Sequence, residues 1–434
     1  MKWTKEQQQV IDIRNRNILV SAAAGSGKTA VLVERIIQKI TAKENPIDID
    51  RLLVVTFTKA AAREMRERIS VAIEKELMKN PEDKNLYKQS VFVRNAHITT
   101  IDSFCLNIVK NYFNEINLNP GFRIADENEL SLIKVDVVGE VLEEFYNDGK
   151  EEFLQMIDKY ASSRGDKNIE EFILNLHGYS MSYPWPKQWL NEIKNNYNVN
   201  KIEDMDKALW MDAAKNNIYN LIYDIKNDTE YAIELCNEPE GPKQYVDNLK
   251  EDLTLYKSIL ITEDYDALYN LVRGFKYSAL SRKKSVCDEQ IKNKVKAIRD
   301  KAKKVLIDIQ KKYFYQSPEE MFKDMKSCKT SIDVIIDITL EFLDRYSKEK
   351  EKRGILDFSD LEHFALDILV KRTEKDGEEI IEPTRVAYTL SNHYEEILID
   401  EYQDSNYVQE TLLNSISKEK FGIPNVFMVG DVKQ

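Results

Sequence analysis

The chain has 434 residues, of which 42% are hydrophobic, so it is long enough for roughly two to four domains with cores of their own. Its 63 basic and 75 acidic residues give a formal net charge of −12, which by itself neither indicates nor excludes a nucleic-acid channel. Four scattered cysteines without CxxC spacing argue against a disulfide framework or a zinc site, and the lack of a long apolar run or signal-peptide core predicts a soluble cytoplasmic protein without a membrane span.

Residues 1–125 alternate short apolar runs with amphipathic segments. We predict strands at 18–20, 52–56 and 97–100, because these runs are short and rich in β-branched residues. Each run is followed by a segment whose apolar residues recur at helical spacing. Such strand–helix alternation is typical of a parallel α/β sheet.

The segment after the first predicted strand has the sequence of a phosphate-binding loop. Residues 22–29 match G-x-x-x-x-G-K-[ST], except that Ala22 stands at the first glycine position. Glycines let backbone amides face phosphate oxygens, the lysine supplies a cation, and the threonine hydroxyl can bind Mg²⁺. A chance Gly–Ser turn could have the same letters, but the predicted strand and helix around it favour a nucleotide site. The nucleotide contacts expected from this loop are Ala24, Gly25, Ser26, Gly27, Lys28 and Thr29.

From residue 126 to residue 349 the sequence is charged and amphipathic, with few strand-like runs. Clear helical stretches run over 129–146 and 289–314. We therefore expect an all-helical insert between two stretches of α/β sequence. Trp185 and Trp189 could stack on DNA in this insert, although we expect them to pack between helices.

Strand-like runs return late in the chain, at 396–400 and 425–429. Asp400 ends a hydrophobic strand, which is where a Mg²⁺ ligand lies in a phosphate-loop protein, and Glu401 beside it can act as general base for the attacking water. An acidic surface loop is the alternative, and the apolar strand before it argues against that. Phosphoryl transfer to water needs positioning and charge neutralisation rather than a protein nucleophile.

Several of these segments resemble the motifs of superfamily 1A DNA helicases. Residues 3–7 resemble their Q motif, 55–65 motif Ia, 100–105 motif Ib, 399–406 motif II and 429–434 the opening of motif III. Within that family, residues 22–29 and 100–105 are most similar to AddA-type subunits of AddAB helicase–nucleases, and the Leu-Asp-Phe-Ser-Asp-Leu segment at 356–361 resembles both those subunits and their RecB relatives. Tyr402 stands where the family usually has Phe, and Asp102 where His is common.

The resemblance implies that residues 1–125 and 350–434 form one RecA-like ATP-binding domain with a parallel sheet (domain 1A). Residues 126–349 would be the helical domain inserted into it (domain 1B). The implied cofactors are ATP and Mg²⁺. The implied catalytic residues are Lys28, Asp400, Glu401 and Gln403. Further nucleotide contacts would come from Gln7, which would contact the adenine, and from Gln434.

The resemblance also assigns residues to Mg²⁺ and to DNA. Thr29 and Asp400 would bind Mg²⁺, and Phe57, Thr58 and Thr100 would line a track for single-stranded DNA. Aromatic stacking in such a track tolerates any base, as a translocating enzyme requires. Phe57 could equally be a core aromatic at a strand end.

By this resemblance, the complete enzyme would couple ATP hydrolysis to 3′→5′ translocation, unwind DNA ends and degrade DNA in double-strand break repair, together with an AddB-like nuclease subunit. The family needs a second RecA-like domain that supplies arginines to the γ-phosphate. No such sequence follows Gln434, so we expect an N-terminal part of a longer protein that alone binds ATP weakly and hydrolyses it poorly. The alternatives are a stand-alone UvrD/Rep/PcrA-type helicase without nuclease and a non-catalytic DNA-binding scaffold. A P-loop kinase lacks support from the segments at 55–65 and 100–105.

Overall fold

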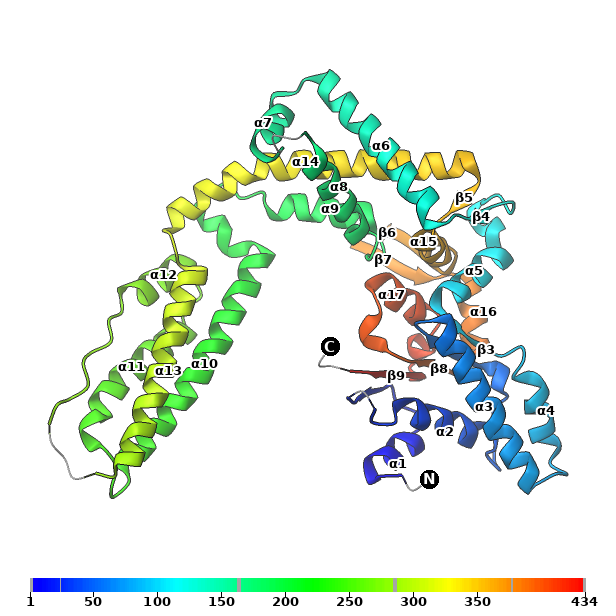
Figure 1. Ribbon diagram of the computed structural model, residues 1–434, viewed down its shortest axis with the longest axis horizontal. Coiled ribbons are helices and arrows are strands. Elements are labelled where there is room, and N and C mark those ends of the chain that lie inside the picture. The colour runs from blue at the N-terminus through cyan, green and yellow to red at the C-terminus, as the bar shows by residue number, and fades with distance from the viewer. Residues whose placement is uncertain (1–2, 24, 162–164, 284–286, 376–377, 432–434) are drawn as a thin grey trace. The chain divides into compact units, whose positions relative to one another are not determined.

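The computed structural model describes residues 3–23, 25–161, 165–283, 287–375 and 378–431 (Figure 1). Its contacts divide the chain into two compact units. The first, here called the core unit, comprises Met1–Glu144, Lys167–Trp189 and Thr339–Gln434. The second, here called the helical unit, comprises Phe145–Asp166 and Leu190–Ile338. None of the helices in the described part of the chain is both long and apolar enough to cross a membrane.

The core unit is built on a five-stranded parallel sheet with the strand order β1-β9-β8-β2-β3. The strands are β1 (Ile18–Ser21), β2 (Leu52–Thr56), β3 (His97–Thr100), β8 (Glu396–Ile399) and β9 (Val426–Gly430). All five predicted strands are confirmed within a residue at either end. The two late strands pair between β1 and β2, so sequence from both ends of the chain forms one sheet.

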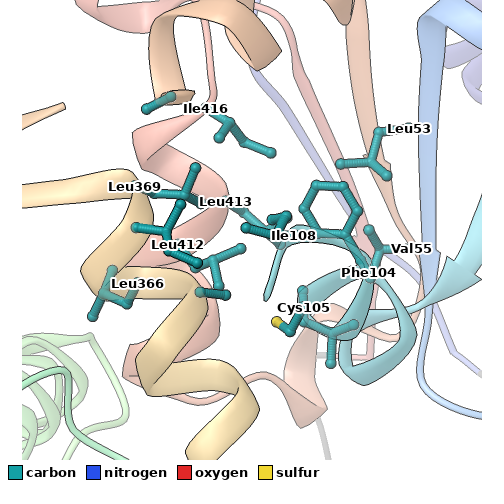
Figure 2. Close-up of a cluster of buried hydrophobic side chains, with 14 of the residues drawn as sticks. Leu53, Val55, Phe104, Cys105, Ile108, Leu366, Leu369, Leu412, Leu413 and Ile416 are labelled. Carbon is teal, nitrogen blue, oxygen red and sulfur yellow. The ribbon is translucent and has the colours of Figure 1, made fainter. Parts of the chain in front are cut away.

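Apolar side chains cover both faces of this sheet because successive residues of a strand point to opposite faces. On one face, Val54, Leu398 and Phe427 pack with the apolar side of α2 (Lys28–Ile40) and α3 (Lys59–Lys79). On the other face, Leu53, Val55 and Ile399 pack with α5 (Ile101–Tyr112), α15 (Phe358–Leu369) and α17 (Tyr407–Ser415). Figure 2 shows the leucines of α15 and α17 gathered with Phe104 and Ile108 of α5.

The remaining elements near the sheet are short. They are the helices α1 (Lys5–Asp12), α4 (Lys84–Phe92) and α16 (Arg385–His393), the parallel strand pair β4 (Arg123–Ile124) and β5 (Ile355–Leu356), and the 3-10 helices η1 (Ile49–Arg51), η2 (Phe113–Ile116), η5 (Tyr402–Asp404) and η6 (Glu419–Phe421). An antiparallel hairpin, β6 (Val370–Lys375) and β7 (Glu378–Pro383), was not predicted.

The described residues between β4 and β5 form helices and no strand, as the sequence pattern predicted. They are α6 (Glu127–Asp148), α7 (Glu151–Tyr160), α8 (Lys167–Ser180), α9 (Pro186–Asn196), α10 (Leu209–Asn237), α11 (Val246–Leu260), α12 (Tyr265–Gly274), α13 (Glu289–Tyr313) and α14 (Pro318–Arg353), with the 3-10 helices η3 (Ile202–Lys207) and η4 (Lys243–Tyr245). The expected insert boundaries at 126 and 349 stay a prediction, since the contacts group 126–144, 167–189 and 339–349 with the core unit.

The segment at 356–361 has a structural role at the junction of α14 and α15. Asp357 and Asp360 cap α15 reciprocally, each carboxylate accepting a hydrogen bond from the other residue's backbone N–H. The buried Lys350 ammonium, near the end of α14, lies 2.8 Å from the Asp357 carboxylate and 2.7 Å from the Asp360 carboxylate. This cluster fixes the end of α14 to the start of α15 because a buried charge is tolerated only when it is paired.

Candidate nucleotide-binding site

The five parallel strands place their carboxyl ends along one edge of the sheet. The loop 22–27 follows β1, Asp431 follows β9, and Asp400 and Glu401 follow β8. Phe57 follows β2 on the same edge. The sheet therefore gathers residues from both ends of the sequence into one row.

Two glycines shape the loop between β1 and α2. Gly25 and Gly27 have φ angles of +78° and +83°, a left-handed backbone that residues with a Cβ rarely adopt. Gly27 directly precedes α2, so the unpaired amides of the first turn of α2 face the loop. Ala22 has no such φ, and its N–H donates to the Gly430 carbonyl at 3.1 Å. Alanine therefore fits at the position where the motif usually has glycine.

An ion pair joins the two distant halves of the site. The Lys28 Nζ lies 3.1 Å from the Glu401 Oε2, although 373 residues separate them. Gln403 donates from Nε2 to the same Glu401 oxygen at 2.8 Å. The Gln403 Oε1 accepts the N–H of Asp431 at 2.9 Å, which ties the end of β9 into the same network.

The two neighbouring carboxyl groups are held in different electrostatic environments. Burial and the nearby Glu401 charge raise the pKa of Asp400 above its ordinary value. Hydrogen bonding by Gln403 and then by Lys28 lowers the pKa of Glu401, outweighing its partial burial. Glu401 also has a left-handed backbone, with φ of 53°, an uncommon conformation for a non-glycine residue. Glu401 is therefore an ionised acceptor at neutral pH, next to a carboxyl group that is easier to protonate.

These residues surround a cavity of about 330 Å³, close to the lower limit for small-molecule sites. Its lining consists of Gly25, Gly27, Lys28, Thr29, Ala30, Arg68, Glu401 and Asp431. The sequence analysis did not find Arg68, which lies on α3 and pairs with Glu64 at 2.5 Å. One arginine on a highly charged helix has no motif of its own, so only the fold places it at the cavity.

The predicted adenine contact, Gln7, lies against the phosphate loop. Its Nε2 donates to the Ser26 carbonyl at 3.1 Å, and its Oε1 accepts the N–H of Thr4 at 3.0 Å. A Cβ added at Gly27 would come within 3.4 Å of the Gln7 Nε2, so the two residues are close neighbours. Ala24 and Gln434, the other predicted nucleotide contacts, lie outside the described residues.

The three residues assigned to a DNA track differ in exposure. The Phe57 side chain is 56% exposed, so it is not the core aromatic that the alternative required. Thr58 caps α3 by accepting the Ala61 N–H at 3.1 Å. Thr100 is only 4% exposed, and its hydroxyl caps α5. Their contact with DNA stays a prediction, with Phe57 the residue that offers an open surface.

The two tryptophans considered as DNA-stacking residues both contact protein side chains in the core unit. The Trp189 ring stacks on Tyr183 with centroids 4.5 Å apart, and Tyr183 stacks in turn on Tyr407 at 5.1 Å. The Arg372 guanidinium lies 4.4 Å from the centroid of the Trp185 ring. These contacts favour the packing role that the sequence analysis expected.

Comparison with known proteins gives one consistent result. Residues 3–434 match the family model of the UvrD/REP helicase N-terminal domain. The chain is similar over its whole length to proteins named as the A-type subunit of an ATP-dependent helicase/nuclease: 47% identical to that of Lachnoclostridium phytofermentans, and 42% identical to those of Clostridium beijerinckii and Clostridium perfringens strain 13. It spans 32%, 35% and 34% of their respective lengths, about a third in each case.

Proposed function

The chain belongs to the UvrD/REP helicase N-terminal domain family, and from this premise we propose that it is the N-terminal motor part of an AddA-type ATP-dependent helicase–nuclease subunit. The longer protein couples ATP hydrolysis to 3′→5′ translocation and unwinds DNA ends for double-strand break repair. Its nuclease partner is an AddB-like subunit. The names of the similar proteins support the nuclease and the partner, because they describe a nuclease and one member of a multi-subunit enzyme.

The observation that carries this proposal is the meeting of Lys28 and Glu401 beside a glycine-shaped loop. Lys28 is a cation at the start of a helix, where backbone amides and the helix dipole already favour an anion. Glu401 is a carboxylate of lowered pKa that lines the same cavity and lies 3.1 Å from the Lys28 Nζ. A phosphate-binding cation facing a proton acceptor is what hydrolysis of a nucleoside triphosphate requires.

The residues present fit ATP at both of its ends. The left-handed glycines and Lys28 supply donors and positive charge for phosphates. After its two internal hydrogen bonds, the Gln7 amide retains one N–H and one carbonyl lone pair. A glutamine amide pairs in this way with the N6 and N7 atoms of adenine. The site therefore has a phosphate end at Lys28, which lines the cavity, and a base-reading side chain at Gln7, which contacts the phosphate loop beside the cavity.

A Mg²⁺ ion would take oxygen ligands from Thr29 and Asp400. Mg²⁺ prefers hard oxygen ligands and shares them with substrate phosphates and water. The described residues contain no cluster of three or more His, Cys, Asp or Glu side chains suited to a metal ion. A Mg²⁺ ion here therefore depends on the nucleotide for part of its coordination.

Four side chains would then have separate roles in hydrolysis. ATP, when bound, supplies the phosphoanhydride whose outer phosphoryl group is transferred to water. Lys28 neutralises negative charge on the outer phosphates. Glu401 orients the water and accepts its proton, and Gln403 holds the Glu401 carboxylate in place. Arg68, on the cavity wall, adds a second positive charge.

The proposal is tested by ATP binding to this chain and to Lys28→Ala, measured by calorimetry with Mg²⁺. We expect weak binding by the parent chain and a loss of at least tenfold in Lys28→Ala, because a charge-assisted contact to phosphate is removed. Lys88→Ala is the matched control, since Lys88 pairs with Asp48 on a different surface. Equal ATP affinity of Lys28→Ala and the parent chain would contradict the site assignment.

In the longer protein, Lys28→Ala should abolish unwinding of a duplex end while nuclease cleavage of single-stranded DNA continues. This chain alone should hydrolyse ATP slowly, because it spans about a third of the length of the helicase/nuclease subunits that it matches and a helicase site draws arginines from a second RecA-like domain. Unwinding by the Lys28→Ala protein would refute the motor assignment. DNA-stimulated hydrolysis by this chain at the turnover of a complete helicase would refute the need for a second domain.

A further inference from the structure

Helix α1, which carries Gln7, is held to the sheet by little apolar contact. Of its eight residues, Ile11 is the one that is fully buried. Burying one such side chain stabilises the fold by less than it costs to order a separate helix. The position of Gln7 therefore depends on other contacts of α1.

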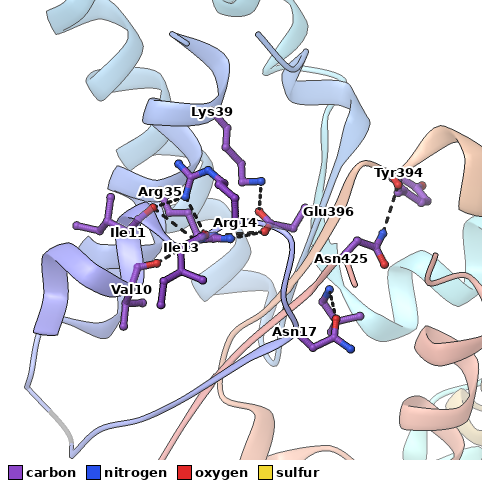
Figure 3. A network of polar contacts seen from close by, with 11 residues as sticks. Val10, Ile11, Ile13, Arg14, Asn17, Arg35, Lys39, Tyr394, Glu396 and Asn425 are labelled. Carbon is purple, nitrogen blue, oxygen red and sulfur yellow. Dashed lines mark hydrogen bonds and ion pairs between the residues drawn. The ribbon is translucent and has the colours of Figure 1, made fainter. Parts of the chain in front are cut away.

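The polar contacts that hold α1 come mainly from Arg35, in the middle of α2 (Figure 3). The Arg35 side chain is only 1% exposed. Its Nη1 donates to the Val10 carbonyl at 2.9 Å and to the Ile13 carbonyl at 2.7 Å, at the carboxyl end of α1. These carbonyls have no partner within the helix, and the dipole of α1 is negative there, so a buried guanidinium is well matched to them.

The other side of the Arg35 guanidinium faces the first residue of β8. Its Nη2 lies 2.6 Å from the Glu396 Oε1, and the Lys39 Nζ lies 3.2 Å from the second Glu396 oxygen. The Arg35 guanidinium also lies 4.7 Å from the centroid of the Phe427 ring on β9. A single planar group thus joins α1, α2 and two central strands.

Three of the elements that Arg35 joins carry parts of the nucleotide site. Helix α1 carries Gln7, α2 begins at Lys28, and β8 leads to Asp400 and Glu401. We propose that Arg35, paired with Glu396, is a positioning residue that sets the Gln7 amide relative to the phosphate loop and so determines the preference for adenine. This inference rests on the proposed nucleotide function and adds to it a determinant of base selection far from the base.

The proposal separates binding of the base from binding of the phosphates. The phosphate contacts come from the 22–27 loop and Lys28, which are joined directly to β1 and α2. Helix α1 contacts this loop through the hydrogen bond from the Gln7 Nε2 to the Ser26 carbonyl, and it contributes no residue to the cavity lining. Loss of the Arg35 contacts should therefore weaken the binding of ATP, through its adenine, and leave the affinity for a ligand without a base unchanged. A purely structural role would weaken both ligands together.

The test compares Kd values for ATP, GTP and inorganic tripolyphosphate, each with Mg²⁺, on the full 434-residue chain. The main variant is Arg35→Lys. A lysine ammonium can still pair with Glu396, but it lacks the branched guanidinium whose second nitrogen reaches the α1 carbonyls. The matched control is Arg51→Lys. Arg51 pairs with the neighbouring Glu395 at 2.6 Å and donates to the carbonyls of Asn392 and His393, but does not contact α1.

We expect Arg35→Lys to lose about tenfold of the preference for ATP over GTP, within the range of a glutamine–adenine contact. The Kd for tripolyphosphate should stay within about twofold of the parent value, and Arg51→Lys should change neither quantity. An unchanged ATP-to-GTP ratio in folded Arg35→Lys would overturn the inference, as would equal losses for ATP and tripolyphosphate.

A second variant covers the case in which Arg35→Lys does not fold. Arg35→Met with Glu396→Gln removes both charges of the pair, leaves an amide for Lys39, and should show the same selective loss. Failure of the proposed function gives a different result: tripolyphosphate then does not bind the parent chain, or binds Lys28→Ala equally well. A parent chain that binds tripolyphosphate through Lys28 but does not prefer ATP to GTP contradicts this inference alone.

Discussion

At the scale of single residues, Lys28 and Glu401 neutralise each other in a direct ion pair at the wall of the candidate cavity. The Lys28 side chain is 10% exposed and that of Glu401 is 42% exposed, so the pair is partly screened by water. An anion that binds Lys28 competes with Glu401 for the same ammonium group. The carboxylate that we propose to serve hydrolysis therefore opposes the binding of an anion at Lys28.

This competition predicts opposite effects of Glu401→Gln on binding and on hydrolysis. The amide cannot compete as an anion for Lys28, so ATP affinity should rise by roughly threefold, as expected for a partly exposed ion pair worth less than about 1 kcal/mol. Hydrolysis by the longer protein should fall by about 10²–10⁴-fold, because the proton acceptor is lost. Calorimetry and a phosphate-release assay measure the two effects. Parallel loss of affinity and turnover would show that Glu401 mainly holds the fold.

The charge on the Asp400 carboxylate affects the free energy of unfolding of the chain. Burial and the adjacent Glu401 charge raise its pKa, so the folded chain holds this proton to a higher pH than the unfolded chain does. The unfolded chain loses the proton first as the pH rises, and the free energy of unfolding therefore falls through the window between the two pKa values. At neutral pH the charged Asp400 carboxylate destabilises the fold.

Asp400→Asn should accordingly stabilise this chain at pH 7 by about 1 kcal/mol. Replacing a residue of a functional site often stabilises a fold, because such residues are not optimised for stability. The amide oxygen can still accept the Glu401 N–H, now 3.2 Å from the Asp400 Oδ1. The gain should disappear near pH 3, where the carboxyl group is protonated in both states. Urea unfolding of both proteins at the two pH values measures the difference. A variant that is less stable than the parent chain at pH 7 would contradict the inference that the charged Asp400 carboxylate destabilises the fold.

At the scale of elements, the α/β part was predictable because its signals are local and regular. The five strands are short β-branched runs, and recognisable chemistry follows some of them, as with the phosphate loop after β1 and Asp400 after β8. The order in which they pair is not local. Nothing in residues 18–56 indicates that β8 and β9 would separate β1 from β2. The expectation that the two ends form one domain comes from the motifs at both ends, among them the phosphate loop and the Asp400–Glu401 segment.

The hairpin β6–β7 was missed although Asp376-Gly377 lies between its strands in the sequence. An Asp-Gly pair is a strong hairpin signal. Its flanks were hard to interpret because they are charged, with Arg372 paired to Ile381 and Thr373 to Ile380, and do not alternate cleanly. A polar hairpin lacks the apolar periodicity on which sequence interpretation depends.

Helix capping explains residues that the motif resemblance assigned to DNA. Thr58 and Thr100 each accept a backbone N–H at the start of α3 and α5. A threonine in that position stabilises a helix by about 1 kcal/mol, which is reason enough for its presence. Phe57 has no such role at its exposed position, so it is the stronger candidate for nucleic-acid contact.

At the scale of the whole molecule, the two units have separate cores. In the helical unit, buried residues of α10, α11, α12 and α13 form one cluster that includes Ile222, Tyr256, Leu268 and Leu306. A fully buried ion pair, with the Arg299 Nε 2.6 Å from an Asp252 oxygen, joins α13 to α11. The continuous segment Leu190–Ile338 contains all of these contacts and has the length of a typical domain.

We therefore expect residues 190–338, expressed alone, to fold into a helical domain. Far-ultraviolet circular dichroism should show a helical spectrum and a single cooperative thermal transition. Leu306→Asp should abolish that transition, because placing a charge in the core costs roughly 3–5 kcal/mol. Lys304→Asp, on the exposed side of the same helix, is the matched control and should leave the transition within a few degrees. A gradual transition in the unsubstituted segment would mean that the helical unit needs the rest of the chain to fold.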